Sequence, residues 1–377
     1  MKIGTCESER GKLTKGILKI GEFKNRPVKI PVLIAQGEEG KNIFISGGMH
    51  GDEINGIELV ERFIRILNPE RLSGTVVFLP LLNSSGFHRQ MRNVFYDDKD
   101  LNRCFGRRGD SISYKMAKSI TDEVVRKCEF GIDCHDSGME KILFPHSRIF
   151  KEKAGITDEL ASIFGTDVVM RRNTEDGMIA LESYRNYKVP VLTVEAGGGM
   201  VIRNDFIKQS LTGLRNILIH YGMLPGKISL PTTQFFLSER KEYVSDLEGV
   251  LNMNVSLGNS VNKDDILAEI YDPHTRENCF IKAKNPGIVL HVKMGAKVNK
   301  EEVVLSLLHF EKSKDELMKP LHAKMIINKE TITNKIHPSV LFDKALKLGG
   351  WTKEDIKRHL YRMNKKSRSL FAAIIKE

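Results

Sequence analysis

Residues 43–53, with the sequence IFISGGMHGDE, constrain the fold more than any other part of this chain. The segment opens with a short apolar run that is typical of a buried strand, and two glycines then end that run. His50 and Glu53 follow three positions apart, on the loop or first helical turn beyond the strand. Because a neutral imidazole and a carboxylate held this close can bind one face of a zinc ion, the segment predicts part of a metal site.

Two later runs could complete such a site. Residues 130–136, FGIDCHD, form another short apolar run, which ends in a cluster containing His135. Residues 194–197, VEAG, place Glu195 at the end of a third strand-like run. A single histidine is more often structural than a metal ligand, but three such strand ends in one chain together suggest a metallohydrolase site.

Four short motifs occur in an order that resembles the succinylglutamate desuccinylase/aspartoacylase family, which belongs with the zinc carboxypeptidase-like hydrolases. The motifs are HGDE at 50–53, DLNR at 100–103, DCH at 133–135 and VEAG at 194–197. The resemblance covers roughly residues 15–310. It implies an α/β fold in which a mixed, largely parallel sheet is flanked by helices and followed by a small β domain.

The resemblance also implies a metal and its ligands. One Zn²⁺ ion per chain would be held by His50, Glu53 and His135, and three protein ligands leave a coordination position open for water. Glu195 would be the general base that deprotonates this metal-activated water, and later the acid that protonates the leaving amine.

Roles toward the substrate follow from the same resemblance. Arg92, or Arg89 in the same loop, would stabilise the oxyanion of the tetrahedral intermediate. Asn102 and Arg103 would bind a substrate carboxylate, because a guanidinium offers it two parallel hydrogen bonds. Arg103 could instead form a structural ion pair with an acid of its own loop, which contains Asp97, Asp98 and Asp100.

The residues around His135 leave alternatives open. Asp133 and Asp136 flank this histidine, and one of them could accept a hydrogen bond from its ring and so fix the tautomer. Both could equally be solvated loop acids. Cys134 lies between Asp133 and His135, and because side chains alternate along a strand, we expect a buried packing thiol rather than a ligand.

Hydrophobic periodicity predicts the elements around these motifs. A strand at 43–46, a helix at 55–67 and a strand at 75–82 form a βαβ unit, which favours a largely parallel sheet under helices. Before this unit we expect a turn at 37–40, preceded by one or two edge strands at 16–20 and 28–34. The other expected elements are strands at 131–134 and 189–194 and helices at 113–128, 151–164 and 205–221.

A sequence repeat marks a second, smaller domain. Residues 254–267 are echoed by residues 291–304, and both copies contain the motif Gly-X-X-Val-Asn-Lys. Two such copies predict a two-fold, flattened β domain that resembles the barrel-sandwich fold of biotinyl and lipoyl domains. Those domains carry a modified lysine between their halves, but the connector at 272–278 contains no lysine, so we expect a scaffold.

These patterns divide the chain into a zinc carboxypeptidase-like catalytic domain at 1–228, the β domain at 229–311 and a helical extension at 312–377. Within the extension, helices are expected at 338–348 and 352–375, and the second has a basic face. A basic helix could contact nucleic acid. A solvated packing or oligomerisation appendage explains the same charge and is the favoured interpretation.

Composition restricts the class of protein. A chain of 377 residues exceeds one ordinary core, and 41% hydrophobic with 28% charged residues is typical of globular domains. The sequence has no apolar run of about 18 residues and no apolar signal segment, and five scattered cysteines favour a reducing, cytoplasmic environment. The net charge of +11 fits a lysine-rich solvated surface as well as it fits an anionic partner.

The sequence therefore predicts a zinc-dependent deacylase that cleaves the amide bond of an N-acyl amino acid or a related N-acylated amine. A carboxypeptidase-like metallopeptidase that uses the same residues is the first alternative. A nucleic-acid-binding or regulatory protein that acts through the basic C-terminal helices is the second. The expected partner is a small N-acylated molecule with a carboxylate, neither a membrane nor nucleic acid is expected, and a homo-oligomer stays open.

Overall fold

The structure of the protein is a computed structural model that describes residues 1–150, 155–173 and 175–310. The chain divides into two compact units. The first comprises residues 1–238 and 291–295, and the second comprises residues 239–290 and the described residues from 296 onward. The predicted extension at 312–377 and its two helices lie outside the described residues, as does the start of the helix expected at 151–164.

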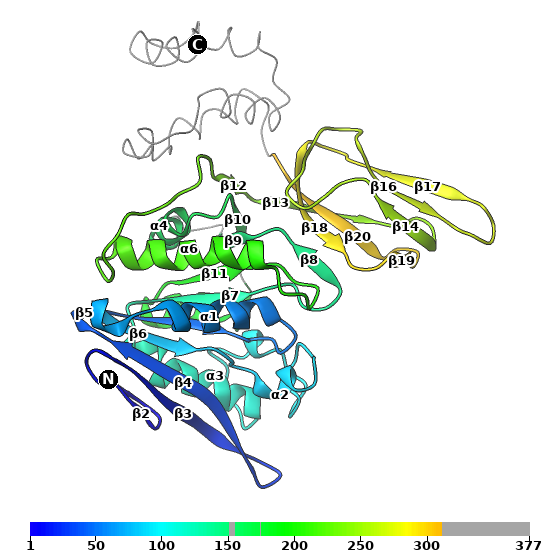
Figure 1. The fold of residues 1–377 in the computed structure, drawn as a ribbon. Coiled ribbons are helices and arrows are strands. Elements are labelled where there is room, and N and C mark those ends of the chain that lie inside the picture. The colour runs from blue at the N-terminus through cyan, green and yellow to red at the C-terminus, as the bar shows by residue number, and fades with distance from the viewer. Residues whose placement is uncertain (151–154, 174, 311–377) are drawn as a thin grey trace, which may run out of the picture. The chain divides into compact units, whose positions relative to one another are not determined.

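A nine-stranded mixed sheet forms the centre of the first unit, in the order β12-β10-β9-β11-β7-β5-β6-β4-β3 (Figure 1). The four central strands β11, β7, β5 and β6 run parallel, whereas β9 is antiparallel to β11, and β4 is antiparallel to both β6 and β3. The prediction of a mixed, largely parallel sheet is confirmed. The strands are β3 (Lys12–Phe23), β4 (Arg26–Gln36), β5 (Glu38–Gly47), β6 (Ser73–Leu79), β7 (Phe130–His135), β9 (His146–Phe150), β10 (Val168–Arg172), β11 (Val191–Glu195) and β12 (Phe235–Leu237).

Helices cover both faces of this sheet, as predicted (Figure 1). The helices α1 (Ile54–Ile66), α4 (Ile156–Phe164) and α6 (Asn204–His220) share one hydrophobic cluster with one face of the sheet. The helices α3 (Ile112–Glu123) and α5 (Ile179–Tyr187) contribute to a second cluster on the other face. Among the described residues, no helix is both long and apolar enough to cross a bilayer.

Shorter elements complete the first unit. They are the paired strands β1 (Lys2–Ile3) and β2 (Cys6–Glu7), the helix α2 (Ser84–Phe87), and the 3₁₀ turns η1 (Pro69–Arg71), η2 (Leu101–Arg103) and η3 (Val125–Lys127). Strand β8 (Lys141–Leu143) pairs with residues 291–293, which belong to the same unit.

Alternation along β7 decides which side chains reach each face of the sheet. Ile132 and Cys134 enter the cluster shared with α1, and Cys134 is fully buried there. The prediction of a packing thiol is confirmed, and burial raises the pKa of this thiol well above its usual value. Asp133 and His135 therefore project from the opposite face of the strand, where both are also buried.

The predictions about the N-terminal strands hold only in part. Of the one or two edge strands expected, β3 lies at the edge of the sheet, whereas β4 lies between β6 and β3. The turn expected at 37–40 is replaced by the start of β5, whose register shifts between Glu38 and Asn42. A Cβ atom on Gly37 would lie 1.7 Å from the carbonyl oxygen of Leu72, so glycine is needed for the chain to pass this backbone.

Strands β9 and β10 were not predicted from the sequence. Their sequences, HSRIF and VVMRR, contain charged residues that interrupt the apolar pattern of a buried strand. In the structure Arg148 and Arg172 lie on these strands, and their side chains are only 18% and 28% exposed. The arginines that interrupt the apolar pattern thus form a polar region on one face of the sheet.

The second unit contains strands of two antiparallel sheets, and some of these strands come from the sequence repeat. Each copy forms a short strand followed by a longer one: β15 and β16 in the first copy, β19 and β20 in the second. The equivalent residues Asp264 and Glu301 both adopt positive φ, at 70° and 66°. The strands are β13 (Glu239–Val244), β14 (Gly249–Met253), β15 (Ser260–Val261), β16 (Ile266–Tyr271), β17 (Asn278–Lys282), β18 (Gly287–Lys293), β19 (Lys297–Val298) and β20 (Val303–His309). The last residues of β18, 291–293, belong to the first unit. Assignment of this unit to the barrel-sandwich type stays a prediction.

A glycine in α1 lets this helix approach the end of β7. A Cβ atom on Gly56 would lie 2.5 Å from the carbonyl oxygen of Cys134, closer than real Cβ contacts allow. The helix axis can therefore lie near the strand only because this side chain is missing. The approach brings Glu53, which precedes α1, toward His135, which ends β7.

We predict that Gly56→Ala weakens both the fold and metal binding, because the added methyl group must push α1 away from β7. Overpacking of this kind costs about 1–3 kcal/mol of unfolding free energy. Chemical denaturation and a zinc titration would measure the two effects. Glu61→Ala on the same helix, where the side chain is 37% exposed, is the control. Equal stability and equal zinc affinity in the two variants would contradict the prediction.

Candidate active site

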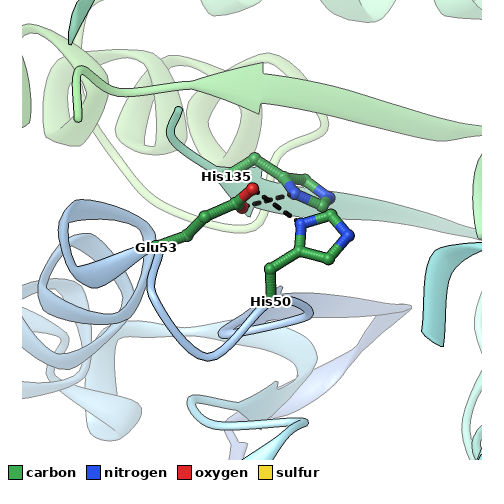
Figure 2. A group of neighbouring side chains, drawn as sticks. All are labelled: His50, Glu53 and His135. Carbon is green, nitrogen blue, oxygen red and sulfur yellow. Dashed lines mark hydrogen bonds and ion pairs between the residues drawn. The ribbon is translucent and has the colours of Figure 1, made fainter. Parts of the chain in front are cut away.

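Three buried side chains converge at the carboxyl ends of β5 and β7. His50 and Glu53 come from the loop between β5 and α1, and His135 is the last residue of β7. Figure 2 shows the Glu53 carboxylate facing both imidazole rings, which lie next to each other. The Nδ1 atom of His50 lies 2.6 Å from one Glu53 oxygen, and Nδ1 of His135 lies 2.7 Å from the other. The ligand atoms of all three residues lie within 4.8 Å of one another.

Carboxylates fix the outer edges of both imidazoles. The Nε2 atom of His135 lies 2.7 Å from Asp133, and the second oxygen of Asp133 accepts a hydrogen bond from the Ser46 hydroxyl at 2.7 Å. The Nε2 atom of His50 lies 3.0 Å from Asp100. A carboxylate at Nε2 favours the tautomer with a proton there, which leaves the Nδ1 lone pair directed at the centre of the cluster.

Electrostatics favour positive charge at the centre of this cluster. Burial alone would lower the pKa of both histidines. The neighbouring carboxylates outweigh burial, Glu53 and Asp100 around His50 and chiefly Asp133 and Glu53 around His135, so both pKa values are raised. Burial would raise the pKa of Glu53, but the charges of His50 and His135 hold it well below its usual value. The three donors thus form a site that stabilises a cation.

The donor set fits a zinc ion. Two imidazole nitrogens and a carboxylate are common zinc ligands, and three protein ligands leave a position for substrate or water. Second carboxylates that orient ligand histidines are typical of metal sites. His50, Glu53 and His135, which the sequence analysis selected as ligands, are thus brought together by the structure.

Asp136 holds the start of α1 in place. One of its oxygens accepts hydrogen bonds from the backbone and side-chain nitrogens of Asn55, at 2.8 and 3.0 Å, and the other accepts from the Gly138 nitrogen at 2.7 Å. Burial and the nearby charge of Glu53 raise the pKa of Asp136 to about 7. Of the two acids that flank His135, Asp133 contacts its ring, and Asp136 anchors the helix that follows Glu53.

Glu195 lies beside His135 at the end of the neighbouring parallel strand β11. Its side chain is 3% exposed, and one oxygen lies 2.6 Å from Nη1 of Arg148. The other oxygen, Oε2, is buried and has no hydrogen-bond partner among the described residues. A buried carboxylate oxygen without a partner is costly in a native protein. The described residues thus leave one oxygen of Glu195, Oε2, without a hydrogen bond.

Arg148 is itself held in position. Its Nε donates to Nε2 of His146 at 3.2 Å, and Nδ1 of His146 lies 2.8 Å from the carbonyl oxygen of Phe144. This arrangement fixes the His146 tautomer, with its proton on Nδ1. Arg148 was not predicted as a site residue, although His146 and Arg148 are spaced two apart and would share one face of a strand.

Arg92 lies beside the histidine–glutamate cluster. Its Nη2 atom lies 2.8 Å from Asp100, and its Nη1 atom lies 3.4 Å from Glu53. Asp100 therefore contacts both Arg92 and His50. Burial would raise the pKa of Asp100, but His50 and Arg92 hold it well below the usual range. The alternative candidate, Arg89, stacks instead on the ring of Phe95, 3.5 Å from its centroid.

Asn102 and Arg103 occupy different environments. The side-chain oxygen of Asn102 accepts a hydrogen bond from the backbone nitrogen of Ile179, the first residue of α5, at 2.9 Å. Arg103 is 32% exposed, and its Nε atom lies 2.8 Å from Glu175. Its Nη1 atom is farther from Asp100, at 3.9 Å. The main carboxylate partner of Arg103 is thus Glu175, which the sequence analysis did not consider.

Comparisons with known proteins relate this fold to deacylases. Residues 39–221 match the model of the succinylglutamate desuccinylase/aspartoacylase catalytic domain. A curated relative, the N-alpha-acetyl-L-2,4-diaminobutyric acid deacetylase of Halomonas elongata, is 28% identical over 318 residues. That match covers 80% of this chain and 92% of the relative. Residues 39–221 are thus a succinylglutamate desuccinylase/aspartoacylase catalytic domain, and the relative that matches over most of this chain is a hydrolytic deacylase.

Solved structures share the fold. The product-bound ectoine utilization protein of Ruegeria pomeroyi superposes with a TM-score of 0.72 at 22% identity, over 81% of this chain and 98% of that one. A succinylglutamate desuccinylase from a Silicibacter species gives a TM-score of 0.71 at 20% identity, over 82% of this chain and 100% of that one. At these identities the likeness supports the mixed α/β fold and nothing finer.

We predict that Asp133→Asn lowers zinc affinity by about 10–100-fold, because the variant no longer orients the His135 ring with a charged acceptor. A competition titration against a chelator would measure the change. Ser46→Ala is the control, because it removes the other hydrogen bond of Asp133 without touching the histidine. Unchanged affinity in Asp133→Asn would show that this carboxylate does not support the ligand.

Proposed function

We propose that this protein is a zinc-dependent deacylase that hydrolyses the amide bond of an N-acylated amino acid. The observation that carries the proposal is the buried cluster of His50, Glu53 and His135, with Glu195 beside it. Two imidazoles and a carboxylate are a ligand set of hydrolytic zinc sites. A second carboxylate with one unpartnered buried oxygen gives the site a group that can accept a proton.

Glu195 would act as base and then as acid. Its Oε2 atom accepts the proton of the attacking water, and the same oxygen returns that proton to the nitrogen of the leaving amine. Arg148 holds the other oxygen, so the carboxylate keeps one orientation in both steps. Bound zinc supplies Lewis-acid chemistry, which polarises the amide carbonyl and makes water acidic enough to lose a proton near neutral pH.

Arg92 would stabilise the negative charge that develops on the carbonyl oxygen. Its guanidinium is half-exposed, and it is held next to the ligand Glu53 by Asp100. A donor fixed in advance at the site of developing charge stabilises a transition state without further reorganisation. The partners of Arg92 thus support the role that the sequence resemblance implied.

A small acylated amino acid is the substrate class that the comparisons favour. The Halomonas elongata relative is named for an N-acetylated diamino acid. Arg103 offers a partly exposed guanidinium that a substrate carboxylate could bind. We therefore propose an N-acylated amino acid with a free carboxylate as the substrate.

Metal analysis combined with a substrate screen tests the proposal. The purified protein is expected to bind about one zinc ion per chain and to hydrolyse N-acetyl or N-succinyl amino acids. Chelation should abolish this activity and added zinc should restore it, whereas His135→Ala should lack both zinc and activity. Hydrolysis of peptides alone would identify a metallopeptidase instead. A zinc-loaded protein without hydrolytic activity toward any of these substrates would overturn the proposal.

Glu195→Gln separates the base from the metal ligands. The variant should keep its zinc, because Glu195 is not one of the three clustered donors. It should lose about 10²–10⁴-fold in kcat, the usual contribution of a general base. Zinc content and steady-state kinetics measure the two effects, and Glu58→Gln on the surface of α1 is the control. Full activity in Glu195→Gln would show that another group accepts the proton.

A further inference from the structure

Glu175 bridges two arginines near the candidate active site. One of its oxygens lies 2.8 Å from Nε of Arg103, and the other lies 3.2 Å from Nη2 of Arg172. The two arginines come from different parts of the chain, since Arg103 ends η2 and Arg172 ends β10. A single carboxylate thus receives one guanidinium on each oxygen.

Arg172 belongs to the polar face of the sheet that carries Glu195. In the register of β10 against β9, Met170 pairs with Arg148, and residues two apart on a strand share a face. Arg172 therefore lies on the same face as Arg148, which holds Glu195. Burial and the positive charge of Arg148 lower the pKa of Arg172, and the charges of Glu195 and Arg103 also act on it. Arg172 is thus within electrostatic range of Glu195, the proposed base.

Resting on the proposed deacylase function, we propose that Arg103 and Arg172 together form the subsite for the substrate carboxylate. In this subsite Glu175 occupies the place of that carboxylate, and a bound substrate displaces it. Arg172 is then a residue that determines specificity, and Glu175 is an internal competitor for the subsite.

The geometry suits a carboxylate ligand. Each guanidinium also donates to a backbone carbonyl oxygen, Arg103 to that of Asn102 at 2.9 Å and Arg172 to that of Asn173 at 3.2 Å. These bonds restrain both side chains and leave their remaining N–H groups for an anion. Because Glu175 is itself a carboxylate, its contacts show that two guanidiniums at this spacing can hold such a group.

Displacement of the Glu175 side chain by a substrate carboxylate requires little free energy. Glu175 is 54% exposed and the two arginines are 32% and 28% exposed, so these ion pairs are weak compared with buried ones. The exchange replaces one negative charge with another, so the charge around Arg103 and Arg172 does not change. A substrate whose carboxylate is converted to an amide lacks that charge and cannot compete equally with Glu175.

Steady-state kinetics of Arg172→Met and Glu175→Gln test the proposal, using an N-acylated amino acid that the wild type hydrolyses and its carboxamide. Arg172→Met should raise KM for the carboxylate substrate about tenfold, with a smaller effect on kcat, and should change KM for the carboxamide little. Arg103→Met should act in the same direction. Glu175→Gln should lower KM for the carboxylate substrate several-fold, because the internal competitor is weakened.

A neighbouring ion pair supplies matched controls. Arg185 and Asp176 lie 3.0 Å apart, with side chains 52% and 73% exposed, and they have no part in the proposed subsite. Arg185→Met and Asp176→Asn should leave KM for both substrates at the wild-type value. Equal shifts in the control variants would show a general effect of surface charge and would overturn the proposal.

Binding measured without turnover separates this proposal from the proposed function. Calorimetry on the Glu195→Gln protein would compare an N-acetyl amino acid with its carboxamide, with and without Arg172→Met. Loss of the preference for the carboxylate in Arg172→Met supports the subsite. Active wild type with unchanged KM in both Arg172→Met and Glu175→Gln overturns the subsite and leaves the deacylase function standing. No binding of either ligand overturns the subsite, and an absence of hydrolysis by wild type overturns the function.

Discussion

The position of one carboxylate, that of Glu53, decides the rest of this site. Its two oxygens meet the Nδ1 atoms of two histidines that are 85 positions apart in the sequence, His50 and His135. Burial of three such polar groups is costly unless each is paired, and the Glu53 carboxylate pairs with both imidazoles. Gly56 and Asp136 serve this geometry, one by letting α1 approach β7 and the other by anchoring the start of that helix.

Around these three side chains, acidic and basic residues are paired with one another. Asp100 and Asp133 contact the outer edges of His50 and His135, and Arg92 contacts Asp100 in turn. Further acids pair with other arginines, Glu195 with Arg148 and Glu175 with both Arg103 and Arg172. Each group therefore has a partner of opposite charge, which lowers the cost of placing it in or near the interior. Oε2 of Glu195, the proposed base, departs from this pattern because it is buried without a partner among the described residues.

Much of the fold could be predicted because local patterns and global structure agree. The strand at residues 43–46, helix 55–67 and strand 75–82 became β5, α1 and β6, with the parallel pairing expected of a βαβ unit. Prediction failed where charged residues lie inside strands, as in β9 and β10, since periodicity cannot distinguish a buried ion pair from a loop. It failed again at Gly37, where glycine meets a close approach to Leu72 rather than a turn.

The sequence by itself determined the residue types of the site and the resemblance to the family. HGDE, DLNR, DCH and VEAG are local motifs, and their order can be read directly along the chain. Only the tertiary structure decided the partners of those residues. Arg103 could have met Asp97, Asp98 or Asp100 in its own loop, yet its strongest contact is with Glu175, 72 positions away. Likewise, Arg148 reaches Glu195 because β9 runs antiparallel to β11 with Thr193 opposite Arg148. Strand order and register set these contacts, and they depend on packing across the whole sheet rather than on neighbours in sequence.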